Sequence, residues 1–393
     1  MSGTLTEGAT IKTFIKLYNR QVLELPLWDT VAKICVICDR EFFSPFDQRV
    51  YKEVKSMSKK GHEVEIITPH KTTESKKIDN VLVHCISTTG PFGLTAFRII
   101  KKALMKKYDL FYCHELDPLI YSWIIKKISR RPIIWDCHEY LVPMKRELQG
   151  NFSAFLTKIA LSLLAPNTDH IITVDNKLGK QLSQFSPVTV IPNYPTIKEF
   201  PLQEKKEKHR IPNILYVGSL TKERGVEKMI KAFKIVKKNI DVKLTIVGGF
   251  YDSKLERWAK EFDRKNNLNI SWKGWVKYND LAPHFSETDI GLCILQDSER
   301  YMKAISTKIF EYLIMGIPVI TSKGHMSDKL IKMGKCGISA NYNDETEIAQ
   351  AMTKMLEKNS HIQKSKDIIN FSRMRYIWER REHKLLDAIN NLV

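Results

Sequence analysis

The sequence has no long apolar run, and none of its segments approaches the roughly 20 consecutive apolar residues that a membrane-spanning helix needs. Its first twenty residues mix Thr, Lys and Glu and lack the apolar core of a secretory signal peptide. We therefore expect a cytoplasmic protein, peripheral on the cytoplasmic face of a membrane if it binds one.

Recognisable metal motifs are missing as well. The chain has no Asp-x-Asp triplet and no His-Glu-x-x-His pattern. Of its seven cysteines, Cys35 and Cys38 form a C-x-x-C, but they lie in an apolar stretch that is typical of a strand, where this spacing places the two side chains on opposite faces. We expect reduced cysteines in the core, no cofactor and no bound metal.

The charge is far from balanced. The formal net charge is +19, and both halves of the chain carry an excess of Lys and Arg. Such a field suits anionic substrates, an anionic membrane surface or nucleic acid. No motif combines basic residues with stacking aromatics, so we expect no nucleic-acid partner. A generally lysine-rich composition explains the charge equally well.

Short apolar runs alternate with amphipathic helical stretches in two series, which predicts α/β architecture with parallel sheets. The first series has strands at 33–38, 64–68, 81–86, 110–113, 133–136 and 170–174. The second has strands at 214–217, 243–247, 269–272, 290–295 and 318–321. Between them, the prolines of 191–195 and the charged stretch 204–210 indicate a linker.

We expect four segments. Residues 1–30 form an N-terminal extension, in which 11–25 could be helical. Residues 31–200 form one Rossmann-like domain and 201–370 a second. Residues 371–393 form a single C-terminal helix that packs back across the cleft between the domains.

Two segments of the second domain could bind a phosphorylated ligand. Gly218 follows a strand, and Arg224 comes just before a helix N-terminus, where backbone amides favour anions. An ordinary strand-to-helix turn with a surface arginine fits this pattern as well. In the second segment, Ser306 and Thr307 are good helix caps, and Lys308 and Glu311 share a helical face. An ion pair on the helix surface would also explain Lys308 and Glu311, but not the rest of the segment.

Residues 308–320 resemble the hallmark segment of glycosyltransferase family 4, the retaining enzymes of the GT-B fold. Residues 217–226, which include Ser219, resemble the loop whose basic residues hold the donor diphosphate in that family. Residues 272–276 resemble the segment whose backbone, here at Val276, contacts the nucleobase. Two positions depart from the common pattern: Ser219 stands where many members have arginine, and Lys303 where many have glutamate. The match is closest to enzymes of surface-polysaccharide and O-antigen synthesis.

The first domain carries matching segments around Asp47 and Arg49, at 114–118 and at 136–139. His114, Glu115 and Asp117 follow one predicted strand, and His138 and Glu139 follow the next, so all five belong to loops at the carboxyl edge of the sheet. Two His-Glu pairs could also bind zinc or manganese. The resemblance instead implies that His138 lies beside the reacting sugar and that the other residues line the acceptor side.

The resemblance implies a metal-independent hexosyl- or N-acetylhexosaminyl-type transferase that uses a nucleotide-diphosphate sugar, UDP rather than GDP, and a glycan or lipid-linked acceptor. Catalysis would rest on His138, Arg224 and Lys308. A sugar-nucleotide epimerase or hydrolase on the same fold is one alternative. A basic scaffold without catalysis, binding nucleic acid or a membrane, is the other.

One stretch favours a membrane surface. Residues 96–107 predict an amphipathic helix with Phe97, Ile100, Ala103 and Leu104 on one side. Its lysines, together with Lys126, Lys127, Arg130 and Arg131, could contact anionic headgroups. Ordinary packing on the sheet with solvated lysines accounts for the same pattern.

Overall fold

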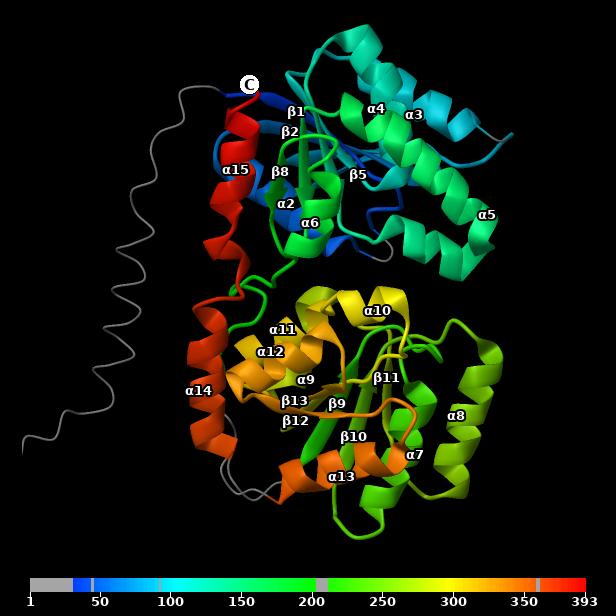
Figure 1. Cartoon of the computed structure of the whole chain (residues 1–393), viewed down its shortest axis with the longest axis vertical. Helices are drawn as coiled ribbons and strands as arrows, with labels where there is room; N and C mark the ends of the chain where they lie inside the picture. The colour runs from blue at the N-terminus through cyan, green and yellow to red at the C-terminus, as the bar shows by residue number, and fades with distance from the viewer. Residues whose placement is uncertain (1–30, 44–45, 92, 203–210, 358–360) are drawn as a thin grey trace, which may run out of the picture.

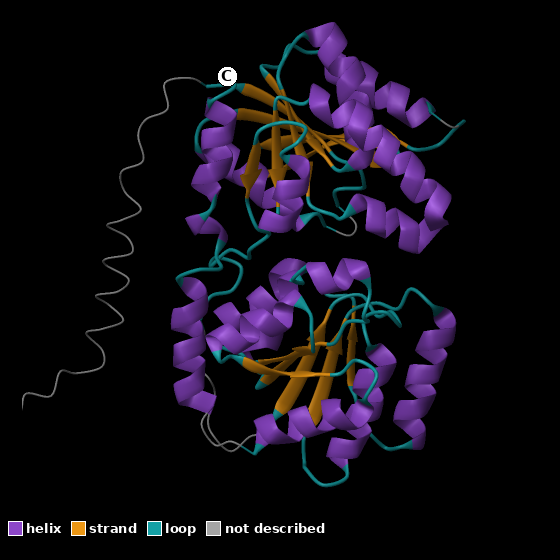
Figure 2. Ribbon diagram, viewed as in Figure 1, coloured by secondary structure: helices purple, strands orange, loops and turns teal. Residues whose placement is uncertain are grey.

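The computed structural model describes residues 31–393 except 44–45, 92, 203–210 and 358–360. Two α/β halves follow one another along the chain, and each is built on its own sheet (Figures 1 and 2). This confirms the predicted fold class. The expected helix at 11–25 and the charged stretch at 204–210 lie outside the described residues.

The first half contains an eight-stranded sheet in the order β3-β4-β2-β1-β5-β6-β7-β8, in which β3 alone pairs antiparallel. Its strands are β1 (Lys33–Ile37), β2 (Glu63–His70), β3 (Glu74–Ile78), β4 (Val81–Ser87), β5 (Leu110–His114), β6 (Ile133–Cys137), β7 (His170–Thr173) and β8 (Val188–Val190). Its helices are α2 (Gln48–Lys59), α3 (Leu94–Leu104), α4 (Leu116–Ser129), α5 (Leu141–Leu164), the short η1 (Ala165–Asn167) and α6 (Asn176–Leu182). All six expected strands are present, while β3 and β8 were not predicted.

The second half contains a six-stranded parallel sheet in the order β11-β10-β9-β12-β13-β14. Its strands are β9 (Asn213–Val217), β10 (Lys243–Val247), β11 (Ser271–Gly274), β12 (Ile290–Cys293), β13 (Val319–Ser322) and β14 (Gly337–Ala340). Its helical segments are α7 (Val226–Lys237), α8 (Ser253–Lys265), η2 (Tyr278–Asp280), α9 (Ala282–Ser286), α10 (Glu299–Lys303), α11 (Thr307–Ile314), α12 (Met326–Gly334) and α13 (Glu345–Leu356). The five expected strands are present, and β14 is additional.

Central strands are apolar because helices cover both faces of each sheet. Every residue of β5, β6 and β9 is buried, as expected for parallel strands inside an α/β layer. All seven cysteines are buried and unpaired. Cys35 packs into one apolar cluster of the first half and Cys38 into another, which confirms that they lie on opposite faces of the sheet.

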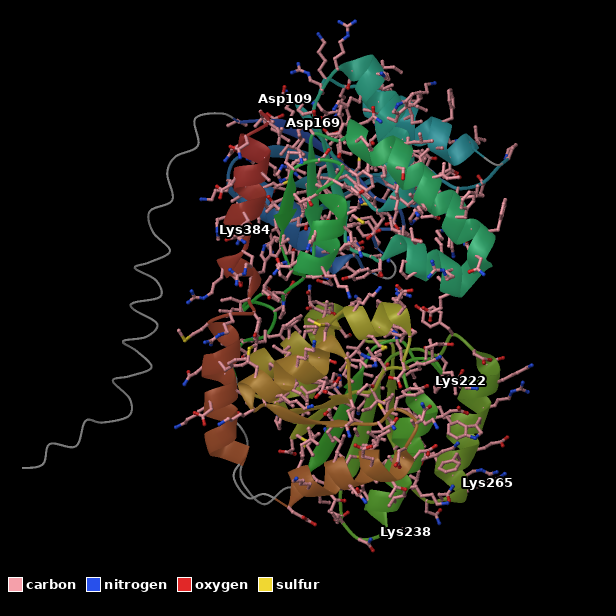
Figure 3. The ribbon with its side chains drawn as sticks, in the orientation of Figure 1. Asp109, Asp169, Lys222, Lys238, Lys265 and Lys384 are labelled. Carbon is pink, nitrogen blue, oxygen red and sulfur yellow. The ribbon has the colours of Figure 1, made fainter. Side chains whose placement is uncertain are left out.

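Two aspartates mark the amino ends of strands in the first sheet. Asp109 accepts a hydrogen bond from the backbone N–H of Lys33, and Asp169 accepts one from that of Ile133. Both lie on the side of the first half that is remote from the second half (Figure 3). The carboxyl ends of these strands, and the loops that follow them, therefore point toward the second half.

The C-terminal segment crosses between the halves, and the prediction of one helix over 370–393 was wrong. Helix α14 (His361–Arg373) packs on α11, and α15 (Glu382–Asn390) packs on α2 (Figure 1). Between them, η3 (Trp378–Arg380) follows an extended residue, Ile377. The helix is interrupted because Ile377 packs into the core of the second half while Trp378 packs into that of the first.

Helix α3 also differs from expectation. It ends at Leu104 and not at residue 107, and Ile100, Ala103 and Leu104 pack against an apolar cluster, as the ordinary alternative expects. Phe97 does not: 62% of it is exposed. Arg98 is bound to the backbone oxygens of Ser87 and Thr89. Among the described residues, no helix combines the length and the apolar character needed to cross a membrane.

Candidate active site

Two glycine turns lie side by side at the carboxyl ends of β9 and β10. Gly218 has φ +133° and Gly248 has φ +152°, conformations that side-chain-bearing residues rarely adopt. A Cβ on Gly248 would lie 1.9 Å from the Gly218 carbonyl oxygen. The two backbones can therefore approach this closely only because Gly248 has no side chain.

Two cations converge on the first of these turns. A Cβ on Gly218 would lie 2.9 Å from Lys308 Nζ and 3.4 Å from Arg224 Nη1. Arg224 reaches the turn from the loop before α7, and Lys308 from the first turn of α11. Two cationic side chains beside a partly buried glycine turn form an arrangement that suits a phosphorylated ligand.

The ammonium group of Lys308 is buried without a hydrogen-bond partner among the described residues. It lies 4.0 Å from the centroid of the Tyr216 ring, a cation–π contact. Burial lowers the pKa of Lys308 to about 8. A buried, unpaired cation is costly unless an anion compensates it.

Arg224 is held beside two tyrosines. Burial alone would lower the pKa of Arg224, but Tyr216 and Tyr301 outweigh it and the pKa is raised. Gly225, with φ +69°, is the N-cap of α7, so Arg224 directly precedes that helix as predicted. Ser219 lies in the same loop, where its carbonyl oxygen accepts a hydrogen bond from the Tyr216 hydroxyl at 2.8 Å.

Glu311 lies one turn after Lys308 and is also buried. Its Oε1 accepts a hydrogen bond from the Tyr278 hydroxyl at 3.0 Å, and burial raises its pKa to about 7. Lys308 and Glu311 are both buried, and no ion pair joins them in the described structure. The alternative of an ion pair on the protein surface is therefore wrong for these two residues. Val276, two residues before Tyr278, packs against the apolar cluster that contains α11.

Helix α11 begins where the sequence predicted, but its N-cap residue does not cap it through its side chain. Ser306 is the N-cap and Thr307 the first helical residue. The hydroxyl of Ser306 makes no capping hydrogen bond. It lies instead beside Cys293 at the end of β12. The first turn of the helix is therefore not capped by its own N-cap side chain, which leaves its amides for a ligand.

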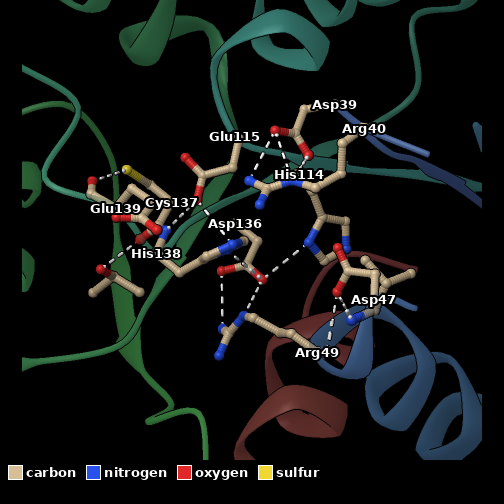
Figure 4. A network of polar contacts seen from close by, with 12 residues as sticks. Asp39, Arg40, Asp47, Arg49, His114, Glu115, Asp136, Cys137, His138 and Glu139 are labelled. Atoms are coloured by element: carbon tan, nitrogen blue, oxygen red, sulfur yellow. Dashed lines mark hydrogen bonds and ion pairs between the residues drawn. The ribbon is translucent and has the colours of Figure 1, made fainter. Parts of the chain in front are cut away.

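In the first half, a buried ion pair connects α2 with the end of β6 (Figure 4). Arg49 Nε lies 2.6 Å from Asp136 Oδ2, and Arg49 Nη2 lies 3.2 Å from Glu53 Oε1. Arg49 Nη1 also donates to the carbonyl oxygen of Ile191. Burial would raise the pKa of Asp136, but Arg49 outweighs it and the pKa is lowered. Arg49 thus holds the end of β6 against α2.

Two histidines flank Asp136. His114 Nδ1 lies 3.2 Å from Asp136 Oδ2, and His114 Nε2 lies 3.6 Å from Glu53 Oε2. Burial alone would lower the pKa of His114, but Asp136 outweighs it and the pKa is raised. His138 Nδ1 lies 3.9 Å from the same Asp136 oxygen, and burial lowers the His138 pKa to about 3. His138 is therefore neutral at physiological pH.

Glu115 holds His138 in place through a strained backbone. Its Oε1 lies 3.0 Å from His138 Nε2 and accepts a hydrogen bond from the His138 backbone N–H at 3.1 Å. Its φ of 63° and ψ of −161° belong to a region that is essentially restricted to glycine. The Trp135 indole N–H donates to the Glu115 carbonyl oxygen, which helps to fix this conformation. Backbone strain of this kind is concentrated at functional sites.

The remaining predicted acceptor-side residues have different positions. Asp47 caps α2 by accepting from the backbone N–H groups of Arg49 and Val50. Asp117 lies exposed in the first turn of α4, away from the contacts around Asp136. Glu139 accepts from Arg300 Nη2 with both oxygens at 3.2 Å. Asp47 nevertheless lies in the same polar network as His114 and His138 (Figure 4), whereas Asp117 is exposed.

The Glu139–Arg300 contact connects the two halves of the site. Glu139 directly follows His138, and Arg300 directly precedes Tyr301, which lies beside Arg224. A second contact, 3.1 Å long, joins Arg146 of α5, the helix that follows Glu139, to Glu299 of α10. The loops that follow β6 and β12 therefore meet, and they bring the His138 region to the region of Arg224 and Lys308.

Among the described residues, two groups could hold a metal ion: His114, Asp136 and His138, and separately His70, Glu74 and Cys85. In the first group Asp136 Oδ2 already contacts the guanidinium of Arg49 at 2.6 Å, and a divalent ion would lie next to that positive charge. In the second group Thr72 donates its backbone N–H to His70 Nδ1. In each group, therefore, another contact already occupies one of the atoms that could bind an ion.

Asp136, Glu53 and Tyr278 were not singled out in the sequence. Asp136 carried a usable signal, because it is a charged residue in an otherwise apolar strand and a buried carboxylate needs a cationic partner. Glu53 lies four residues after Arg49 on α2, a spacing that permits an ion pair. Tyr278 carried no signal, because only the fold brings it to Glu311.

Two glycosyltransferase families match the chain, one in each half. Residues 48–194 match the family Glycosyltransferase Family 4, and residues 198–375 match Glycosyl transferases group 1. The chain belongs to glycosyltransferase family 4. Its two matched segments contain the Asp136 network and the Gly218 turn, respectively.

Individual relatives are distant. The uncharacterized glycosyltransferase MJ1069 of Methanocaldococcus jannaschii is 22% identical over 258 residues, which is 61% of this chain and 62% of the relative. The fold is similar to that of sucrose-phosphate synthase from Thermosynechococcus elongatus, with a TM-score of 0.75, 15% identity and coverage of 92% of this chain and 99% of the other. It is also similar to Anabaena HepE in complex with UDP and glucose, with a TM-score of 0.71, 14% identity and coverage of 92% and 100%. These likenesses confirm the GT-B fold.

Proposed function

We propose that the chain is a retaining glycosyltransferase that moves a hexosyl or N-acetylhexosaminyl group from a nucleotide-diphosphate donor to a glycan or lipid-linked acceptor of surface-polysaccharide or glycolipid synthesis. UDP is the favoured nucleotide, and the structural similarity to a UDP-bound protein supports this choice. The transferase acts in the cytoplasm, at the membrane surface where the acceptor is lipid-linked. Residues 31–200 are its acceptor-side domain and 201–370 its donor domain.

The observation that carries the proposal is the convergence of Lys308 and Arg224 on Gly218. Lys308 Nζ has no hydrogen-bond partner among the described residues, so a bound diphosphate would supply the missing anion. Charge-assisted hydrogen bonds of this kind are roughly twice as strong as neutral ones. Glu311, one helical turn away, is placed to accept hydrogen bonds from the ribose hydroxyls.

The reaction breaks the bond between the anomeric carbon and the phosphate oxygen of the donor. Negative charge grows on the departing diphosphate, where Arg224, Lys308 and the first amides of α11 stabilise it. The acceptor oxygen forms its new bond on the same face of the sugar. A phosphate oxygen of the leaving group takes the proton of the acceptor hydroxyl, so no enzyme nucleophile is needed.

His138 positions the sugar and the acceptor on the opposite side of the site. Glu115, 3.0 Å from Nε2, fixes the orientation of the ring, while Nδ1 has no hydrogen-bond partner among the described residues. Since the ring is neutral at physiological pH, Nδ1 can make one hydrogen bond without adding charge. We propose that the two cations replace the metal ion that other glycosyltransferases use to neutralise the diphosphate.

Turnover assays with UDP-, GDP- and ADP-sugars and candidate acceptors test the function. A transferase releases nucleoside diphosphate at a high rate only when an acceptor is present. Equal release without an acceptor would indicate a hydrolase, and interconversion of the donor without release would indicate an epimerase. Failure of every nucleotide to bind would favour a non-catalytic scaffold.

A further inference from the structure

A row of large apolar side chains lies exposed on α5. After a kink at Gly150, the second part of this helix carries Phe152, Phe155, Leu156, Ile159 and Leu163 on its outer side. Phe152 is 74% exposed and Leu163 is 67% exposed. Their spacing of three or four residues places them in one stripe along the helix.

The opposite side of this helix is apolar too. Ala154 is buried, and Leu161 and Leu164 pack against an apolar cluster of the first half. A surface helix normally presents charged or polar residues to solvent. From residue 148 to residue 168 the chain has no acidic residue, and Lys158 is its one basic residue. A helix that is apolar on both sides needs a second apolar surface to cover the outer one.

Helix α4 extends the stripe. Ile120, Trp123 and Ile128 are exposed at spacings of three and five residues, and α4 packs between α3 and α5. All three helices lie on one side of the first half (Figure 1). We call the exposed residues of the two helices the α4–α5 face: Ile120, Trp123, Ile128, Phe152, Phe155, Leu156, Ile159 and Leu163. This many large apolar side chains exposed on two neighbouring helices indicates an interaction site.

The charges around the α4–α5 face indicate what covers it. Seven exposed basic residues lie on these three helices or just after them, and two of the seven, Lys106 and Arg131, are paired with Glu65 and Asp109; the seven are Lys101, Lys106, Lys107, Lys127, Arg130, Arg131 and Lys158. Acidic residues on the three helices are limited to Asp117 and Glu147. A second copy of the chain would bring the same positive charges together across a symmetric interface, which is unfavourable. An anionic surface with an apolar interior complements both features.

We propose that the α4–α5 face inserts into the interfacial layer of an anionic lipid bilayer while the surrounding lysines and arginines contact its headgroups. Apolar side chains of a surface helix enter the boundary between headgroups and acyl chains, and Trp is favoured at that depth. Each basic residue near the surface adds electrostatic attraction to anionic headgroups. Phe97, exposed on α3, extends the same surface.

This docking gives the site access to a lipid-linked acceptor, a use that rests on the proposed function. Helix α5 begins at Leu141, three residues after His138. The helix that enters the bilayer therefore starts at the acceptor side of the site. Membrane binding itself does not depend on catalysis and can be measured without a donor or an acceptor.

Sedimentation with vesicles tests the inference. We expect wild-type protein to bind vesicles of phosphatidylcholine with 30% phosphatidylglycerol much more strongly than pure phosphatidylcholine. The Phe152→Ser/Phe155→Ser variant should bind the anionic vesicles about 10-fold or more weakly, because each Phe loses a large apolar contact. Lys127→Glu/Arg130→Glu should weaken binding at low salt. Met333→Ser, at an exposed apolar residue of α12 in the second half, is the matched control and should bind normally.

Equal vesicle binding by Phe152→Ser/Phe155→Ser and wild type would overturn the proposal. A second outcome would also overturn it: the wild type binds no vesicles but forms a concentration-dependent dimer in light scattering, and Phe152→Ser/Phe155→Ser does not form that dimer. Thermal shift with nucleoside diphosphate separates the two claims. If the wild type binds nucleotide but no vesicles, the membrane inference fails and the proposed function stands. If it binds vesicles but no nucleotide, the proposed function fails and the membrane inference stands.

Discussion

Lys308 Nζ lies 4.0 Å above the ring of Tyr216, and no acceptor among the described residues reaches it. The ring offers a weak attraction to the cation but cannot replace a hydrogen-bond acceptor. Burial accordingly lowers the pKa of Lys308 to about 8. The protein thus keeps an unpaired, buried ammonium group beside the Gly218 turn, and a bound diphosphate would supply the anion that it lacks.

Replacing Arg224 by Ala should lower kcat/KM for the donor by about 10- to 100-fold. The change removes a charge-assisted contact to phosphate, which is worth about 1.5–3 kcal/mol. Steady-state kinetics with varied donor measure the effect. Lys222→Ala, at an exposed lysine of the same loop, is the matched control and should retain normal kinetics. Normal turnover by Arg224→Ala would rule out its phosphate contact.

The pH dependence of kcat/KM for the donor should be bell-shaped with its maximum between about pH 7 and pH 8. Burial raises the pKa of Glu311 to about 7, so below that pH the carboxyl becomes protonated and accepts hydrogen bonds from ribose less well. Burial lowers the pKa of Lys308 to about 8, so above that pH the cation is lost. His138 stays neutral across this range and adds no further limb.

Two variants assign the limbs of that profile. Glu311→Gln should abolish the acidic limb, and Lys308→Arg, which remains charged, should abolish the alkaline limb. A wild-type profile that is flat from pH 6 to pH 9 would contradict the assigned roles.

Glu311 and His138 should differ in the kinetic parameter that they control. Glu311→Ala should raise the donor KM more than it lowers kcat, because ribose contacts stabilise the bound donor and the transition state alike. His138→Ala should mainly lower kcat, because the residue lies beside the reacting sugar. Initial rates over a full range of donor concentration separate the two parameters. The reverse pattern would exchange the proposed roles.

Activity should survive EDTA. Arg224 and Lys308 supply the positive charge that a metal ion would otherwise bring to the diphosphate. Turnover is measured after dialysis against EDTA and again after addition of Mn²⁺ or Mg²⁺. Loss of activity that either ion restores would instead assign a metal to the His114, Asp136 and His138 group.

Most of the fold follows from local pattern, because parallel strands buried on both faces read as apolar runs. The unpredicted strands lack this signal. Strand β3 has the sequence Glu-Ser-Lys-Lys-Ile and lies at the sheet edge, where one side faces solvent. Strands β8 and β14 also lie at sheet edges and are mostly only half-buried. The break before Trp378 is invisible locally, because it arises from the packing of two separate cores.

The site was predictable where its chemistry lies in short motifs and not where it depends on distant contacts. Arg224, Lys308 and Glu311 lie on turns and helix starts that the sequence specifies. By contrast, the unpaired state of Lys308 and the strain at Glu115 appear only in three dimensions. Arg49 was expected to line the acceptor side, whereas its guanidinium is engaged by Asp136 and Glu53.

Calorimetric binding of nucleoside diphosphate to wild type and to Lys308→Met tests the central claim most directly. Of UDP, GDP and ADP, the one that binds wild type should bind far more tightly than its parent nucleoside, because the diphosphate meets Lys308 and Arg224. In Lys308→Met this advantage should fall by about 10-fold or more, while nucleoside binding stays unchanged. An unchanged advantage of diphosphate over nucleoside in Lys308→Met would contradict the account.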